Sequence, residues 1–283
     1  MMHAVFPHIA DAFRRTNRNF ALVLVPILLD AFALWAGWAI LGRFVRQDWS
    51  VRIILEIGLP SISHVMERPL LANTLPFLAA ARYSDAAVVV FALLLVASCF
   101  AQGGYIGALH AIAGGGRFRL PLFYRAGKRS VLRLLLLYAT VQLLKSAVAL
   151  LLAAIAGASG IFLALLVMLA LRVIYLFLEF VIVVESQDWI GALGRAKKLL
   201  KASCGRTLAT AAVWLAVSGA MSASLHRIAS PAGLLAAIAI YAYAMTWIHV
   251  SLMMHFVKAQ AETDSAAPRT AAAAKRDRHA PGT

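Results

Sequence analysis

The sequence predicts an all-α fold: a polytopic membrane bundle of six transmembrane helices, with a cytoplasmic amphipathic helix at the membrane interface. Of the 283 residues, 62% are hydrophobic and only 14% are charged, whereas about 25% of residues are charged in a typical soluble domain. A hydrocarbon layer of about 30 Å is crossed by roughly 20 helical residues. Six apolar runs reach about that length, over residues 20–41, 86–113, 134–156, 161–184, 207–225 and 231–256.

The third and fourth apolar runs form a predicted hairpin, because only the four small residues 157–160 separate them. Lys145 lies near the middle of the first arm, and Arg172 lies near the middle of the second, two helical turns before Glu179. A charged side chain at that depth costs roughly 2.5–3.5 kcal/mol, so such groups are usually partnered. We therefore predict a buried polar cluster, which either binds a ligand or fixes helix packing. Its members are Asp30, Gln142, Lys145, Arg172 and Glu179.

The two ends of the chain are predicted to behave differently. The first apolar run is longer than the 7–15 residues of a secretory signal core and lacks a small-residue cleavage site, so we expect a retained span. Two short apolar stretches in the connection 42–85, at 49–57 and 70–81, are expected to lie along the membrane surface. The last residues are rich in Ala, Thr and Arg. They predict a membrane domain over 1–257 and a disordered cytoplasmic tail over 258–283.

Basic residues flank the apolar runs unevenly and so predict the orientation. In the six-span arrangement, 19 Lys and Arg residues fall on the side that holds both termini, and 6 fall on the other side. Positive residues accumulate on the cytoplasmic side of a membrane, so both termini are predicted to be cytoplasmic. The net charge of +15 has the same explanation, because the basic residues do not form the single patch that nucleic-acid binding requires. No nucleic-acid partner is expected.

Two further patterns indicate contacts. Gly103 and Gly107 have the four-residue spacing that lets two helix backbones approach closely. Residues 186–203 alternate apolar and basic residues at helical spacing, which predicts the interfacial helix. Its basic side is a candidate surface for anionic lipid headgroups or a simple topological anchor. The basic residues are Arg195, Lys197, Lys198 and Lys201.

Catalytic and metal-binding patterns are weak. The run Gly157-Ala158-Ser159-Gly160 matches the G-x-S-G of rhomboid intramembrane proteases, which need a histidine near the serine as base. The candidate histidine, His249, lies much deeper in its span than Ser159 and lacks the glycines that follow it in that family. Small residues in a tight turn explain the motif. Because no metal-ligand spacing and no phosphate-binding loop occurs, we expect no metal and no cofactor.

Three stretches carry a resemblance to a known group of proteins. They are LVLVPILLDAFAL within residues 19–34, QGGYIGA at 102–108 and VVESQDWIGALGRAKKLLKASCGRT at 183–207. In pattern and order they resemble uncharacterised six-helix bacterial inner-membrane proteins, similar to the membrane domain of some glycerophosphodiester phosphodiesterases. The resemblance implies a helical module in a bacterial inner membrane. It does not imply phosphodiesterase activity, because the catalytic domain of those enzymes has no counterpart here.

The sequence thus favours a non-enzymatic membrane module that interacts with lipids, chiefly with anionic headgroups, or with a partner membrane protein. A small transporter or lipid-translocating protein that uses the buried polar cluster is the alternative. A polar cavity that reaches the cluster would favour transport, and a dry core would favour the first hypothesis. A rhomboid-like serine protease ranks third.

Overall fold

The computed structural model describes residues 5–41, 55, 58–66, 85–228 and 230–277, and it confirms the all-α prediction: the secondary structure in these ranges is entirely helical. The helices are α1 (Val5–Arg18), α2 (Ala21–Leu41), the 3-10 helix η2 (Ile62–His64), α4 (Asp85–Ala113), α5 (Leu120–Ile174), α6 (Leu178–Val184), α7 (Trp189–Leu225) and α8 (Pro231–Asp277). Four helices in the described ranges (α4, α5, α7 and α8) are long and apolar enough to cross a membrane, or five spans if α1 and α2 count together as one bent span. The membrane class of the chain is therefore supported.

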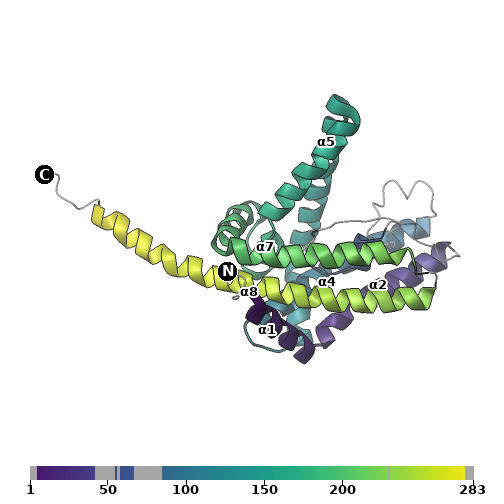
Figure 1. The fold of residues 1–283 in the computed structure, drawn as a ribbon, viewed down its shortest axis with the longest axis horizontal. Helices are drawn as coiled ribbons and strands as arrows, with labels where there is room; N and C mark the ends of the chain where they lie inside the picture. Colours follow the sequence, from purple (N-terminus) through teal and green to yellow (C-terminus); the bar gives the residue numbers. More distant parts are fainter. Residues whose placement is uncertain (1–4, 42–54, 56–57, 67–84, 229, 278–283) are drawn as a thin grey trace.

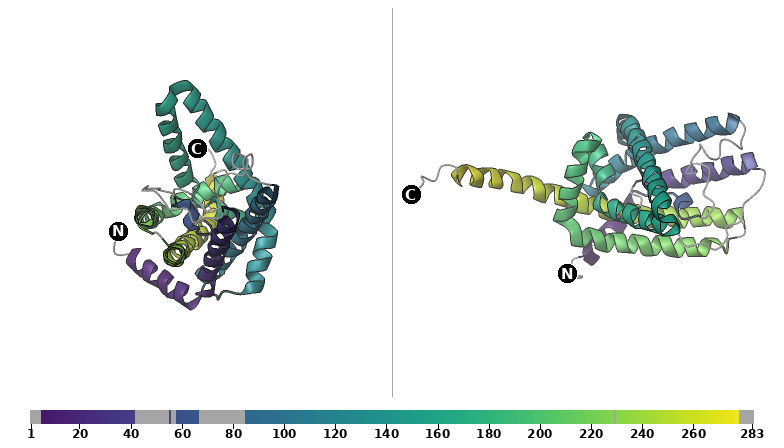
Figure 2. Two further views of the ribbon diagram at one scale, coloured as in Figure 1. Left: turned by 90° about the vertical axis from the view of Figure 1, so that its right-hand side faces the viewer. Right: turned by 90° about the horizontal axis from the view of Figure 1, so that it is seen from above.

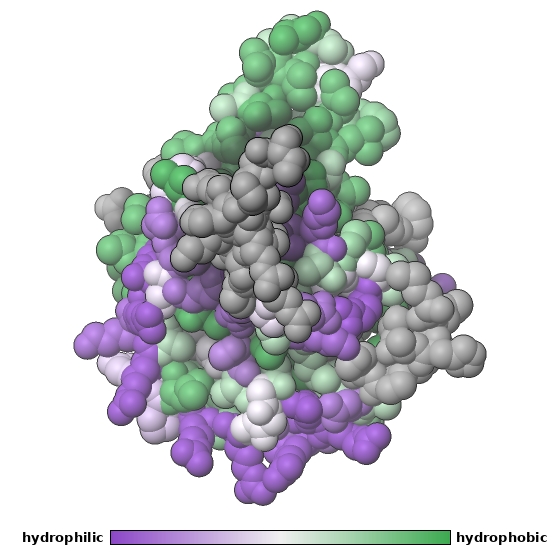
Figure 3. Space-filling view, turned by 90° about the vertical axis from the view of Figure 1, so that its left-hand side faces the viewer, coloured by the Kyte–Doolittle hydropathy of each residue, from purple (hydrophilic) through white to green (hydrophobic). Residues whose placement is uncertain are grey.

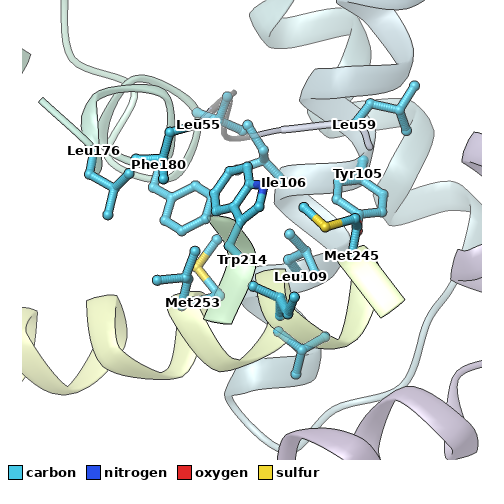
Figure 4. Close-up of a cluster of buried hydrophobic side chains, with 14 of the residues drawn as sticks. Leu55, Leu59, Tyr105, Ile106, Leu109, Leu176, Phe180, Trp214, Met245 and Met253 are labelled. Carbon is cyan, nitrogen blue, oxygen red and sulfur yellow. The ribbon is translucent and has the colours of Figure 1, made fainter. Parts of the chain in front are cut away.

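Helices α2, α4, α7 and α8 run side by side as a bundle (Figure 1; Figure 2). Its core gathers where α4, α7 and α8 meet, around Trp214, which is 2% exposed. Ile106 and Leu109 of α4 and Met253 of α8 lie beside the indole ring, and Tyr105 and Met245 continue the same buried cluster farther along (Figure 4). Burial of these large side chains away from lipid holds the three helices together by close packing.

Helix α1 precedes the first predicted span and turns 76° away from α2. The sequence interpretation began that span at residue 20 and did not predict a separate helix. Arg15 of α1 donates hydrogen bonds to the backbone oxygens of Ile112 and Ala113, at 3.0 and 2.8 Å. These carbonyls at the end of α4 have no partner within their own helix, so a guanidinium group is a favourable cap. Helix α1 is thereby fixed across the end of the bundle.

Helices α4 and α5 approach closely at the two predicted glycines. A Cβ atom on Gly103 would lie 1.9 Å from the Ser130 hydroxyl, and one on Gly107 would lie 2.4 Å from the Ala126 Cβ. Contacts this short do not occur between real atoms, so the packing requires glycine at both positions. The first turns of α5 thus lie directly on the second half of α4.

Helix α5 is a hairpin and not one straight rod. Gly157 has φ 55° and ψ −132°, a backbone conformation that favours glycine, and it separates two helical arms. A Cβ atom on Gly160 would lie 1.8 Å from the backbone oxygen of Leu152, which shows how tightly the chain reverses. The hairpin stands out from the bundle and crosses the direction of α7 and α8, in contrast to the parallel arrangement expected from the sequence (Figure 1; Figure 2).

The fourth predicted span, 161–184, is broken in the structure. The second arm of α5 ends at Ile174 and α6 begins at Leu178. The ring of Phe177 in the break is buried and packs on Phe180 and Phe256. No glycine or proline marks this position in the sequence, so tertiary packing overrides a continuous apolar helix pattern.

Helices α7 and α8 extend beyond their predicted limits. The interfacial helix predicted over 186–203 and the span predicted over 207–225 belong to one helix, α7. Helix α8 continues to Asp277, so most of the segment predicted as a disordered tail is helical. Alanine, the best helix former, is frequent there. Ion pairs from Arg195 to Asp264 (2.6 Å) and from Arg206 to Glu262 (3.3 Å) fasten this extension to α7.

The α4–α5 contact yields a stability prediction. Gly107→Ala places a methyl group against a Cβ atom that only a backbone shift can move, so we expect a loss of about 1–3 kcal/mol, typical of overpacking. Gly219→Ala in α7 is the matched control, because a Cβ atom there has no neighbour within 4 Å. The control should be neutral or stabilised by up to about 1 kcal/mol. Thermal unfolding in detergent measures both, and equal melting temperatures for the two variants would contradict the proposed packing.

Candidate functional site

A cavity of about 150 Å³ lies at the base of the α5 hairpin. It is bounded by both arms of α5, the start of α6 and η2. The lining residues are His64, Leu137, Tyr138, Val141, Gln142, Lys145, Arg172, Leu178 and Glu179. Four of the five predicted cluster residues therefore surround one space, and Asp30 is not among them.

Arg172 and Glu179 form an ion pair across the break between α5 and α6. Nη1 of Arg172 lies 2.5 Å from Oε1 of Glu179, and the two side chains are 24% and 2% exposed. Nε of Arg172 also donates a 2.5 Å hydrogen bond to the backbone oxygen of Leu55. The other carboxylate oxygen of Glu179, Oε2, is buried and has no hydrogen-bond partner among the described residues. One carboxylate oxygen of the ion pair therefore lacks a hydrogen bond from the described residues.

The first arm of α5 supplies the opposite wall. Gln142 and Lys145 are three residues apart, which places them on the same side of the helix, and both are partly buried. Tyr138, one turn earlier, accepts a hydrogen bond from the side-chain amide of Gln102 in α4. The carbonyl oxygen of that amide accepts a bond from the backbone nitrogen of Leu59, at 3.0 Å. Gln102 therefore ties the chain before η2 to both α4 and α5.

Asp30 has a different role from the one predicted. Its carboxylate accepts a 2.6 Å hydrogen bond from the Ser61 hydroxyl and a 2.7 Å bond from the backbone nitrogen of Ile62. Both donors lie at the N-terminal end of η2, where unsatisfied backbone nitrogens favour a negative charge. Asp30 holds η2 in place and so positions His64, the residue that η2 contributes to the cavity wall.

The sequence interpretation missed the contribution of the long connection 42–85. Residues 58–66 are mostly buried, and Ile62 and Val65 are at most 1% exposed. The alternation of serine and apolar residues in 61–65 was the available signal, but it did not show which polar groups the serines would meet. The two stretches predicted to lie along the membrane surface, 49–57 and 70–81, fall almost entirely outside the described residues.

The predicted lipid-headgroup surface divides into two parts. Arg195 is partly buried and pairs with Glu185 at 3.1 Å as well as with Asp264. Lys197, Lys198 and Lys201 are exposed. Hydrophilic side chains are widespread on the end of the bundle that faces the viewer in Figure 3, in contrast to the apolar hairpin above them. The three lysines remain a candidate headgroup surface, whereas Arg195 links helices.

The serine and histidine of the protease hypothesis are not brought together. Ser159 is exposed at the tip of the hairpin, which points away from α8 (Figure 1). His249 is fully buried in α8, with Nδ1 at 3.5 Å from the Tyr105 hydroxyl and its ring centroid 4.8 Å from that of Trp214. Within the described residues no group of His, Cys, Asp and Glu could hold a metal ion.

Comparison with known protein families, curated proteins and solved structures found no match for this chain. The resemblance to the membrane domain of glycerophosphodiester phosphodiesterases thus stays a prediction.

The ion pair at the cavity yields a second prediction. Arg172→Met leaves Glu179 buried without its partner, which should destabilise the protein by about 3–5 kcal/mol. The double variant Arg172→Met, Glu179→Leu removes both charges and should recover most of that loss. Lys128→Met, an exposed cation on the same helix, is the control and should change little. Denaturation in detergent measures all three, and a double variant no more stable than Arg172→Met would show that the two groups are not energetically coupled.

Proposed function

We propose that this chain is a non-enzymatic integral membrane module that interacts with lipids, and that its six spans are α2, α4, the two arms of α5, α7 and α8. For all six to cross one bilayer, the α5 hairpin would have to swing from the crossed position seen in Figure 1 toward the direction of α7 and α8. In this proposal the membrane is a bacterial inner membrane, with both ends of the chain in the cytoplasm. The start of α1 and the C-terminal end of α8 lie on the same side of the bundle, in keeping with this topology (Figure 1).

The exposed apolar surface of the α5 hairpin carries the proposal. Only 11% of its most apolar 18-residue window is buried, against 50% in α4 and 56% in α8. Leucine and other large apolar side chains cover its arms on several sides, among them Leu143, Leu144, Leu150, Leu151, Ile155, Phe162 and Leu165. A surface helix lying flat would have one polar face, and water would oppose so large an apolar surface. Contact with lipid chains, or with another membrane protein, would cover this apolar surface.

A small transporter or lipid-translocating protein is the second candidate. The cavity at the base of the hairpin favours it, because ionisable groups beside an internal space are typical of substrate and ion pathways. A volume of about 150 Å³ admits a small group but not a whole lipid.

The topology proposal can be tested at the hairpin tip. In a protein without Cys99 and Cys204, Ser159→Cys should react with a membrane-impermeant maleimide added outside intact cells, because the tip of a crossing hairpin reaches the far side. Ser265→Cys, exposed on the α8 extension, is the control and should react only after the membrane is opened. A Ser159→Cys that stays unreactive in both conditions would place the hairpin inside the bilayer and reduce the number of spans.

The lipid proposal can be tested by delipidation. The detergent-purified protein should lose thermal stability as bound phospholipid is removed and should regain it when phospholipid is added back, since lipid that binds the folded state stabilises it. In vesicles, movement of labelled lipid between leaflets that depends on the protein would favour the second candidate. A melting temperature that does not change when phospholipid is removed or added back would contradict the proposed lipid interaction.

A further inference from the structure

The cavity at the base of the hairpin contains a buried hydrogen-bond acceptor without a donor. Oε1 of Glu179 accepts a hydrogen bond from Arg172, whereas Oε2 is buried and has no partner in the part of the chain that the structure describes. The Glu179 side chain is 2% exposed and lines the cavity. A buried acceptor without a hydrogen bond costs free energy, which a hydroxyl or N–H group on a ligand would recover.

Gln142 supplies a second polar group, from the opposite wall of the cavity. It lies on the first arm of α5, is partly buried and lines the same space as Glu179. Its side chain forms no hydrogen bond with the described residues. A carboxamide carries both a donor and an acceptor. A ligand between the two walls can therefore donate to Glu179 and bond in either sense to Gln142.

The charged groups around the cavity do not require an ion. Arg172 bonds to Glu179 and to the backbone oxygen of Leu55, and Lys145 also has an interaction partner. An anion would face the unpaired oxygen of Glu179, and a cation would face Lys145 and Arg172. Because burial of a further charge is costly, an uncharged ligand fits this cavity best.

The size and the remaining walls of the cavity limit the ligand further. Leu137, Val141 and Leu178 add apolar surface to the lining, and the volume is about 150 Å³. An engineered cavity of about this volume in another protein holds benzene, a ligand of about six non-hydrogen atoms. Glycerol has the same number of non-hydrogen atoms and combines several hydroxyls with an apolar C–H surface. Leu143, next to Gln142, is 73% exposed, so an acyl chain joined to such a ligand would meet apolar side chains outside the cavity.

We propose that this cavity binds an uncharged vicinal diol of glycerol size, with one hydroxyl donating to Oε2 of Glu179 and the other bonded to the amide of Gln142. The diol is either a free polyol or the glyceryl group of a neutral lipid, since both present the same hydroxyls. The inference goes beyond the proposed lipid interaction, because the site does not require a lipid.

The experiment uses the full chain, delipidated in detergent, with radiolabelled glycerol, monooleoylglycerol and methyl oleate as separate probes. Monooleoylglycerol and methyl oleate share the acyl chain, but only monooleoylglycerol carries free hydroxyls. Native mass spectrometry counts bound lipid, and equilibrium dialysis measures bound glycerol. Monooleoylglycerol should bind at least about fivefold more tightly than methyl oleate, the change that two neutral hydrogen bonds give.

The polar wall is tested by Gln142→Leu, which removes one hydrogen-bonding group and keeps a side chain of similar size. It should weaken the binding of the hydroxyl-bearing probe by at least about twofold, as expected for one neutral hydrogen bond. Thr140→Val is the matched control, because it removes a hydroxyl from an exposed position on the same arm of α5. The control should bind as the wild-type protein does.

Two results support the proposal and separate the two sources of the diol. A preference for monooleoylglycerol that Gln142→Leu reduces identifies a lipid glyceryl group. Saturable glycerol binding that Gln142→Leu weakens, with no preference between the lipids, identifies a free polyol.

Equal binding of the two lipids without saturable glycerol binding would overturn the proposed site and leave the general lipid interaction standing. Binding that a folded Gln142→Leu leaves unchanged would also overturn it. Failure of both lipids to bind while glycerol still binds would refute the proposed function and not the diol site. Helix content and melting temperature establish that Gln142→Leu is folded; if it is not, the wild-type preference and the glycerol measurement decide.

Discussion

The ion pair between Arg172 and Glu179 is the constraint around which the hairpin region is arranged. A charge in hydrocarbon is costly, and these two charges meet across the break between the second arm of α5 and α6. The guanidinium group also holds the backbone of Leu55, which draws the connection after α2 toward the hairpin. The Arg172 side chain therefore joins the end of α5 to the start of α6 and to the distant segment at Leu55.

Small residues supply the second constraint, because they decide where helices can touch. Gly103 and Gly107 allow α5 to begin directly on α4, and Gly157 allows the chain to reverse within a few residues. Between these fixed points the arms of α5 have little protein around them. The hairpin base is thus anchored by close packing and polar contacts, while the outer part of the hairpin makes few contacts with the rest of the protein.

The helical architecture, the reversal at 157–160 and the close approach at the two α4 glycines could be predicted from sequence, since apolar length and small-residue spacing act locally. Four of the five cluster residues also lie together, in keeping with the prediction that Lys145 and Arg172 lie near the middle of the two arms. The partners of Asp30 could not be predicted, because they depend on how residues 58–66 enter the bundle. The break before Leu178 and the steep turn of α1 likewise depend on tertiary contacts without a local sequence signal.

Ion pairs join α8 to α7 beyond the apolar core. The predicted end of the membrane domain at residue 257 therefore falls inside a helix that still contacts α7. A chain shortened there would keep every predicted span but would strip Arg195 and Arg206 of the carboxylates of Asp264 and Glu262. Glu185 would also lose the amide of Gln260. The contacts between α7 and α8 therefore continue for about two helical turns beyond the apolar part of α8, as far as Asp264.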